Sequence, residues 1–187
     1  MRLSLIQSSS SAINSIYILH DFMDNIQYKN FLCEKIKNYT LVDTMDKSTN
    51  VQASMTSWRK LLEDSDFNNL HIKILETLGM IFTLRNPHPE EKYSFYYQDS
   101  WGMSHQKGDL TFNHVHAESR FSGAFYLDVP CPTDMFFDDY DQKVTLKSNM
   151  LLLFPGLCKH KVEKNVSDKK RISMAFNINF ERTDKEK

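Results

Sequence analysis

The pattern of apolar and polar residues changes near residue 90, and before that point it is helical. Two segments, residues 21–39 and Phe67 to about Leu84, repeat apolar residues at approximately helical spacing, so each predicts an amphipathic helix. Asp21 is placed to cap the first helix. A short apolar stretch, Ile16–Leu19, precedes it, and the polar stretch between the helices predicts loops with a short helical turn near 58–62.

After the Asn-Pro-His-Pro cluster at 86–89, which breaks the second helix, short β-rich runs alternate with turns. The runs are 93–103, 109–116, 120–129, 133–139, 143–149, 150–156, 160–165 and 171–180. Strands at this spacing without helices between them are typical of a sandwich or jelly roll rather than a parallel sheet. We therefore predict a mainly β fold in a single domain, residues 1–187. Residues 1–90 form a mainly helical buttress, and residues 91–182 form the β core.

Composition narrows the class of protein. The 187 residues carry 23 Lys and Arg against 24 Asp and Glu, a net charge of −1, so there is no direct signal for nucleic-acid binding. No apolar run approaches the roughly 18 residues that span a bilayer, and the N-terminus lacks the apolar core of a secretory signal. Cys33, Cys131 and Cys158 are odd in number without CxxC spacing, which favours reduced thiols. We expect a cytoplasmic protein without membrane contact, and the sequence indicates no oligomeric state.

Candidate chemistry gathers in the β region. His114 and His116 are two residues apart in a β-rich run, so their side chains would share one face of a strand. Two imidazoles held in this way are a natural start for a transition-metal site, whereas the alternative interpretation is a pair of structural or exposed histidines. A continuing strand would place Glu118 on the same face, as a carboxylate ligand in reserve. Cys158 is expected to be a buried filler rather than a ligand.

Two further residues extend this candidate site. His160 follows an apolar strand and would be the distal ligand if antiparallel pairing returned it beside the first pair. Arg171 starts an alternating strand in which Arg171, Ser173 and Ala175 share one face. A guanidinium that faces into a barrel is costly unless it meets an anion, and its fork suits a carboxylate. Taken alone, however, His160 could close a turn and Arg171 could lie on an edge strand.

The order of these residues resembles a known family. Trp101, Gly108, His114-x-His116, Ser122-Gly123, Tyr126-Leu127-x-Val129-Pro130, Phe154-Pro155, His160 and Arg171-x-Ser173 are similar to the 2-oxoglutarate and Fe(II)-dependent oxygenases. They resemble most a branch of poorly characterised members from bacteria and bacteriophages. The resemblance spans residues 101–180. It implies a double-stranded β-helix (a jelly roll, cupin-like) with Fe(II) on the histidines and 2-oxoglutarate on Arg171 and Ser173. Tyr126 would be an extra donor to the co-substrate.

One position departs from the common pattern of that superfamily. Its usual ligands are a His-x-Asp/Glu pair and a distal histidine, whereas His116 occupies the acidic slot here. The register His116-x-Glu118 would restore a carboxylate. We prefer His114, His116 and His160, because the branch that the sequence resembles carries H-x-H at that place.

The resemblance implies a dioxygenase that uses O2 and 2-oxoglutarate to hydroxylate an unactivated C–H bond, with release of succinate and CO2. If the chain is phage-encoded, it would act in the host cytoplasm. The alternatives are a cupin-like metal dioxygenase independent of 2-oxoglutarate, and a non-enzymatic β-sandwich binding or virion-associated module. The sequence does not identify the substrate: a small molecule, a peptidyl side chain and a nucleoside are all compatible with it. The aromatic and acidic segments around 93–106 and 133–142 are candidate contacts for it.

Overall fold

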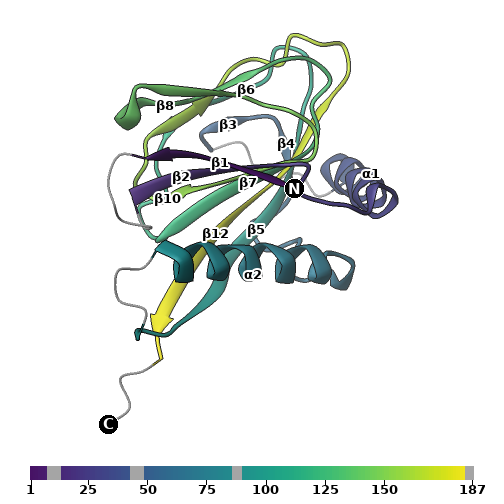
Figure 1. The fold of residues 1–187 in the computed structure, drawn as a ribbon. Helices are drawn as coiled ribbons and strands as arrows, with labels where there is room; N and C mark the ends of the chain where they lie inside the picture. The colour runs from purple at the N-terminus through teal and green to yellow at the C-terminus, as the bar shows by residue number, and fades with distance from the viewer. Residues whose placement is uncertain (8–13, 43–48, 86–89, 184–187) are drawn as a thin grey trace.

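Two antiparallel sheets face each other in the computed structural model, which describes residues 1–7, 14–42, 49–85 and 90–183 (Figure 1). The larger sheet has the order β1-β2-β10-β7-β12-β5-β4 and the smaller sheet the order β3-β6-β11-β8-β9. The larger sheet comprises β1 (Arg2–Gln7), β2 (Ser15–His20), β10 (Met150–Pro155), β7 (Phe121–Asp128), β12 (Arg171–Arg182), β5 (Tyr93–His105) and β4 (Ser54–Met55). The smaller comprises β3 (Val51–Gln52), β6 (Leu110–His114), β11 (His160–Val162), β8 (Asp134–Phe137) and β9 (Gln142–Thr145). The predicted jelly roll, a double-stranded β-helix buttressed by helices, is confirmed.

Both predicted helices are present, but the first begins later than expected. α1 spans Ile26–Val42, and α2 spans Asn68–Arg85 after a short 3-10 turn, η2 (Ser65–Phe67). Asn25, and not Asp21, caps α1, because its Oδ1 accepts the backbone N–H of Tyr28 at 2.9 Å. The prediction for Asp21 was wrong because the backbone next to it is hydrogen-bonded to a distant part of the chain. The backbone N–H of Phe22 donates to the carbonyl of Asn149 at 3.0 Å, which precedes β10.

The N-terminal residues also contribute strands that the periodicity did not reveal. The apolar stretch Ile16–Leu19 lies in β2, which pairs with β1 on one side and with β10 on the other. Ile16 and Ile18 pack between the two sheets, whereas Tyr17 and Leu19 pack on the helical side. A strand that is buried on both faces has no polar alternation, so its sequence does not distinguish it from a piece of helix.

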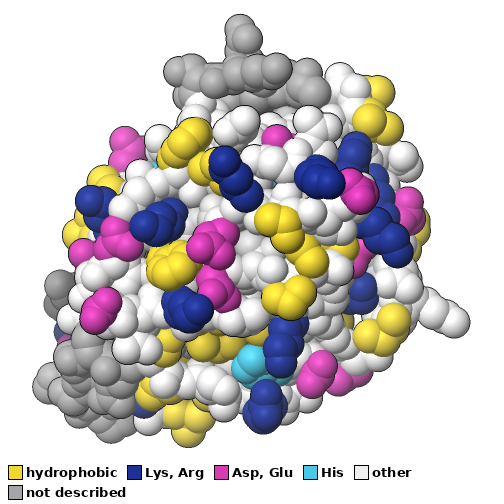
Figure 2. All heavy atoms as spheres, turned by 90° about the horizontal axis from the view of Figure 1, so that it is seen from above, with side chains coloured by type: hydrophobic (Ala, Val, Ile, Leu, Met, Phe, Trp, Pro, Cys, Tyr) yellow, Lys and Arg dark blue, Asp and Glu magenta, His cyan; other side chains and the backbone are white. Residues whose placement is uncertain are grey.

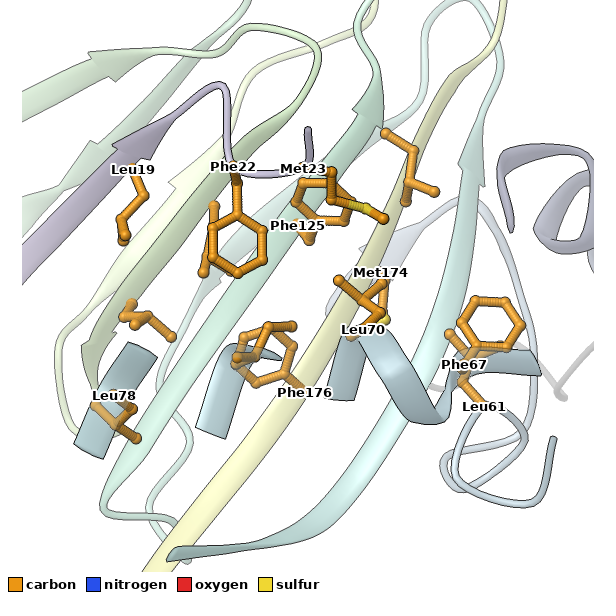
Figure 3. Close-up of a cluster of buried hydrophobic side chains, with 14 of the residues drawn as sticks. Leu19, Phe22, Met23, Leu61, Phe67, Leu70, Leu78, Phe125, Met174 and Phe176 are labelled. Atoms are coloured by element: carbon orange, nitrogen blue, oxygen red, sulfur yellow. The ribbon is translucent and has the colours of Figure 1, made fainter. Parts of the chain in front are cut away.

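The larger sheet separates two apolar layers, and alternation along β12 assigns each residue to one of them. Met174 and Phe176 point toward the helices and pack with residues of α2 such as Leu70 and Leu78 (Figure 3). Ala175, between them in sequence, points to the opposite face. Arg171 and Ser173 line a cavity on that same inner face. The helices therefore cover the outer face of the larger sheet and leave its inner face to the candidate site.

Gly123 in β7 provides a test of how tightly this layer is packed. A Cβ atom added there would lie 2.6 Å from the backbone oxygen of Leu152 and in collision with the ring of Phe176. Because backbone on one side cannot move away cheaply, Gly123→Ala is expected to lower the free energy of unfolding by about 1–3 kcal/mol. Urea denaturation measures this change.

Gly79 in α2 is the matched control. An added Cβ atom would meet nothing within 4 Å at that position. Gly79→Ala is therefore expected to stabilise the protein by about 0.5–1 kcal/mol, since alanine loses less backbone entropy in a helix. Equal effects of the two substitutions would contradict the packing argument.

Candidate metal centre

Three histidines meet between the sheets at one end of the smaller sheet. His114 ends β6 and His160 begins β11, and the two residues are directly paired across the strands. His116 follows β6 and is held by its backbone N–H, which donates to the carbonyl of Gly156 at 2.7 Å. One ligand atom from each imidazole lies within 4.8 Å of the others. Among the described residues this is the group of side chains that could share a metal ion.

The hydrogen bonds of two of these rings settle which nitrogen is available. Nδ1 of His114 lies 2.8 Å from the carbonyl oxygen of Phe112, and Nδ1 of His160 lies 2.8 Å from that of Cys158. A carbonyl can only accept, so each Nδ1 carries the proton and each Nε2 keeps a free lone pair. Backbone acceptors of this kind orient metal-binding histidines and fix their tautomer.

Burial keeps the three rings uncharged at neutral pH. It lowers the pKa of His116 to about 4 and lowers the pKa of His114, and it holds the pKa of His160 well below the ordinary histidine value. Their mutual repulsion as cations acts in the same direction on His116 and His160. Neutral imidazole is the form that binds a metal, so the cluster is ready for one without losing protons first.

The loop after β6, rather than a continuing strand, places His116. β6 ends at His114, and a turn at 117–118 follows. Gly156 makes this possible, because a Cβ atom there would lie 2.7 Å from the carbonyl oxygen of His116 and collide with that of Ser119. The strand therefore does not continue to Glu118, which was the condition for Glu118 to share the face of the histidines. Its side chain is exposed and lies outside the histidine group.

A buried arginine lines the same cavity as the histidines. The cavity has a volume of about 40 Å³, and its lining includes the three histidines, Arg171, Ser173 and Tyr126. Arg171 is 0% exposed, and its Nη1 donates to the carbonyl of Glu163 at 3.2 Å. Its Nε and Nη2, and Oγ of Ser173, have no hydrogen-bond partner within the described part of the chain. Buried polar atoms are rarely left unpaired, so the part of the cavity beside Arg171 is suited to an anion.

Arg171 does not lie on an edge strand, so that alternative is excluded. β12 lies between β7 and β5, and Arg171 pairs with His105 of β5. Burial lowers the pKa of Arg171 from its ordinary value, but a guanidinium starts so high that it stays charged. Burial also raises the pKa of Tyr126 to about 12, which keeps its hydroxyl a neutral donor. That hydroxyl has a weak contact with the sulfur of Met135 at 3.7 Å.

His105 is a cavity residue that the sequence analysis missed. It is 2% exposed, its Nε2 lies 3.3 Å from Oγ1 of Thr111, and its Nδ1 has no partner among the described residues. Burial and the charge of Arg171 hold its pKa well below the ordinary value. The alternation Trp101, Met103, His105 along β5 could have placed it on the inner face, but only the pairing with β12 sets it opposite Arg171.

Comparison with known proteins places the fold. No family model and no curated protein sequence matches the chain. Solved structures do match. The viral collagen prolyl hydroxylase of Paramecium bursaria Chlorella virus-1, in a complex with 2-oxoglutarate, has a TM-score of 0.60 at 15% identity, over 87% of this chain and 94% of its own. HygX from Streptomyces hygroscopicus, with nickel and 2-oxoglutarate bound, has a TM-score of 0.63 at 9% identity, over 88% of this chain and 82% of its own.

A third similar structure is that of an epimerase rather than a hydroxylase. The non-heme alpha-ketoglutarate-dependent epimerase SnoN from nogalamycin biosynthesis has a TM-score of 0.67 at 11% identity, over 89% of this chain and 77% of its own. At these identities the likeness establishes the jelly-roll fold of 2-oxoglutarate oxygenases and not an activity, since one fold hosts several reactions.

Two further observations concern the helices and one face of the molecule. No helix of the described segments is long and apolar enough to cross a membrane. Figure 2, which views the molecule from the side of the smaller sheet, shows hydrophobic, basic and acidic side chains intermixed, without an extended patch of one charge.

Proposed function

We propose that this chain is a non-haem Fe(II) and 2-oxoglutarate-dependent dioxygenase. His114, His116 and His160 would hold the iron, and Arg171 with Ser173 would hold the distal carboxylate of 2-oxoglutarate. The observation that carries the proposal is the shared cavity, which is lined both by three neutral imidazoles and by a guanidinium with unpartnered N–H groups. Within the superfamily we place the chain with the bacterial and bacteriophage members that carry H-x-H, acting in the cytoplasm.

The side chains fit both groups chemically. Three imidazole nitrogens suit divalent iron and leave coordination positions open for other ligands. They bring no negative charge, so the two carboxylates of 2-oxoglutarate would offset two of the three positive charges of the divalent metal and Arg171. The guanidinium offers two parallel N–H groups to a carboxylate, and Ser173 adds a hydroxyl donor. The Tyr126 hydroxyl is a further donor on the neighbouring strand β7.

In such a site the protein mainly binds and orients. When bound, iron and 2-oxoglutarate supply the oxidation, in which one oxygen atom of O2 enters the substrate and the other leaves in succinate, with loss of CO2. Arg171 and Ser173 would fix the direction in which 2-oxoglutarate enters the cavity. Phe154, which packs on His160 with ring centroids 4.6 Å apart, and Trp101 would exclude water beside the metal. We propose hydroxylation of a C–H bond of a small-molecule or peptidyl substrate as the outcome.

Anaerobic titration of the protein with Fe(II) and then 2-oxoglutarate tests the proposal. We expect a weak visible charge-transfer band that saturates at stoichiometric amounts of both. Zn(II) in place of Fe(II) is the control, because it can occupy the histidines without giving that band. Metal binding without the band would favour a cupin-like dioxygenase independent of 2-oxoglutarate. No metal binding would favour a non-enzymatic binding module and would overturn the proposal.

A further inference from the structure

A second hollow opens on the other side of His116. This groove has a volume of about 570 Å³, and His116 lines both it and the cavity that contains Arg171. The side chains that matter for its chemistry are Trp58, Arg59, Asp99, Glu118 and Asn177. The groove therefore reaches the histidine cluster from the surface, on the side away from the guanidinium.

An irregularity in the larger sheet creates this part of the groove. β5 and β12 pair Asp99 with Asn177 and then Tyr97 with Ile178, so Gln98 is an extra residue in β5. Such a β-bulge changes the direction of the neighbouring side chains and is frequent beside active sites. Along the inner face, Arg171 opposite His105 lies at the closed end, and Asn177 opposite Asp99 lies at the groove.

The carboxylate of Asp99 is oriented by buried polar groups. Nδ2 of Asn177 donates to Oδ2 of Asp99 over 3.4 Å, and Oδ1 of Asn177 accepts from Oγ of Ser122 at 2.8 Å. Asn177 and Ser122 are 8% and 1% exposed, so the amide has little freedom to turn. The amide contact is long and leaves acceptor capacity on Asp99, which can bind a donor that enters the groove.

The charges of the groove favour a cation. Neither Asp99 nor Glu118 belongs to an ion pair within the described ranges. The guanidinium of Arg59 donates instead to the backbone carbonyl of Gln98. Two carboxylates against one guanidinium give the lining a net negative charge, beside histidines that are neutral.

An aromatic surface lies at the same place. Trp58 is 39% exposed and stands edge-on to the buried Trp101, with ring centroids 4.7 Å apart and an interplanar angle of 76°. Trp101 in turn packs near His116, at 6.2 Å between centroids. A tryptophan face next to carboxylates is a common way to bind an ammonium or guanidinium group, because the ring quadrupole attracts cations.

We propose that the primary substrate carries a primary ammonium or guanidinium group, which Asp99 binds in this groove with Trp58 alongside. Binding there directs the carbon chain next to the cation toward His116 and the metal that it would hold. Glu118 at the rim adds negative charge that attracts the group. This inference rests on the proposed function, since it names the substrate class of the same site.

Mn(II)-loaded protein with 2-oxoglutarate provides the test, because Mn(II) broadens the NMR signals of any small molecule bound near it. The probes are the N-acetyl methylamides of lysine and arginine, with those of norleucine and glutamate as neutral and anionic counterparts of similar size. We expect at least one cationic probe to be broadened and to bind roughly tenfold more tightly than the norleucine probe, as one charge-assisted hydrogen bond implies. Asp99→Asn should remove this preference.

The controls separate the two proposals. Asp99→Asn is nearly isosteric and can still accept from Asn177, and Asp168→Asn removes one exposed charge that does not line the groove, so only the first should lose the preference. Mn(II) binding is measured separately by its own electron paramagnetic resonance. If Mn(II) and 2-oxoglutarate bind but all probes bind equally, or the anionic probe binds best, the inference is overturned and the oxygenase stands. If Mn(II) does not bind, the proposed function fails first.

Discussion

Replacing His160 by alanine is expected to weaken Fe(II) binding by roughly 100-fold or more and to abolish oxygen-dependent turnover of 2-oxoglutarate. Loss of even an outer partner of a metal ligand costs about 10–100-fold in affinity, so loss of a ligand sets that as a lower bound. His160 is 4% exposed and lies directly opposite His114, and the group of potential ligands among the described residues has no fourth member to replace its imidazole. Calorimetric titration with Fe(II) under anaerobic conditions measures the affinity.

His71→Ala separates this effect from damage to the fold. His71 is also buried, with a pKa lowered to about 4 by burial, but it lies in α2 and its Nε2 contacts Oγ of Ser100 at 3.0 Å. Both substitutions should destabilise the protein, by about 1–3 kcal/mol for the lost hydrogen bond together with the cavity. Only His160→Ala should lose the metal. If Glu118→Ala lost it as well, the alternative register with a carboxylate ligand would be favoured.

Arg171→Met is expected to weaken 2-oxoglutarate binding by roughly 100-fold or more, since two hydrogen bonds to a charged group are lost. In the absence of co-substrate the same substitution should leave stability unchanged or raise it by about 1–3 kcal/mol. The reason is that the buried guanidinium has two unpartnered nitrogens and no ion pair with a described carboxylate. Binding of 2-oxoglutarate to the Zn(II) form and urea denaturation of the metal-free form measure the two effects.

Arg171→Lys is the matched control for charge without the planar fork. It should retain part of the binding, because an ammonium group can make a point contact but not two parallel hydrogen bonds. Binding of 2-oxoglutarate that survives Arg171→Met would contradict the assignment and favour an enzyme independent of this co-substrate. If Arg171→Met lowered the free energy of unfolding by as much as it weakened the free energy of 2-oxoglutarate binding, the role of Arg171 would be to stabilise the fold.

The local patterns of the sequence predicted most of the secondary structure. Apolar repeats located α2 to within about one residue, and the eight β-rich runs correspond to β5 through β12. The alternation that begins at Arg171 assigned Arg171, Ser173 and Ala175 to one face, as the structure has them. Such patterns work because the period of side-chain direction is a property of the local backbone.

Other features depended on contacts between distant residues. The sequence favoured Asp21 as a helix cap. In the structure the carbonyl of Asn149, far along the chain, accepts the backbone N–H of the next residue, Phe22. The β-rich run of His114 was expected to extend through His116, but β6 ends at His114 and the backbone of Gly156 holds the chain that follows. The segment around 93–106, a candidate for substrate contact, lies mostly in strand β5, and Gln98 and Asp99 are its residues that line the groove.

The sequence alone therefore determined the periodicity of the elements, the order of the histidines and the arginine, and the superfamily that they resemble. The tertiary structure decided that His160 lies opposite His114, that Arg171 is buried without a carboxylate, and that His105 and Asp99 line the two cavities. The physical reason is that the register of strand pairing and the position of a bulge are set by packing between residues distant in sequence. A local sequence pattern indicates on which face of a strand a residue lies, but not which strand pairs beside it.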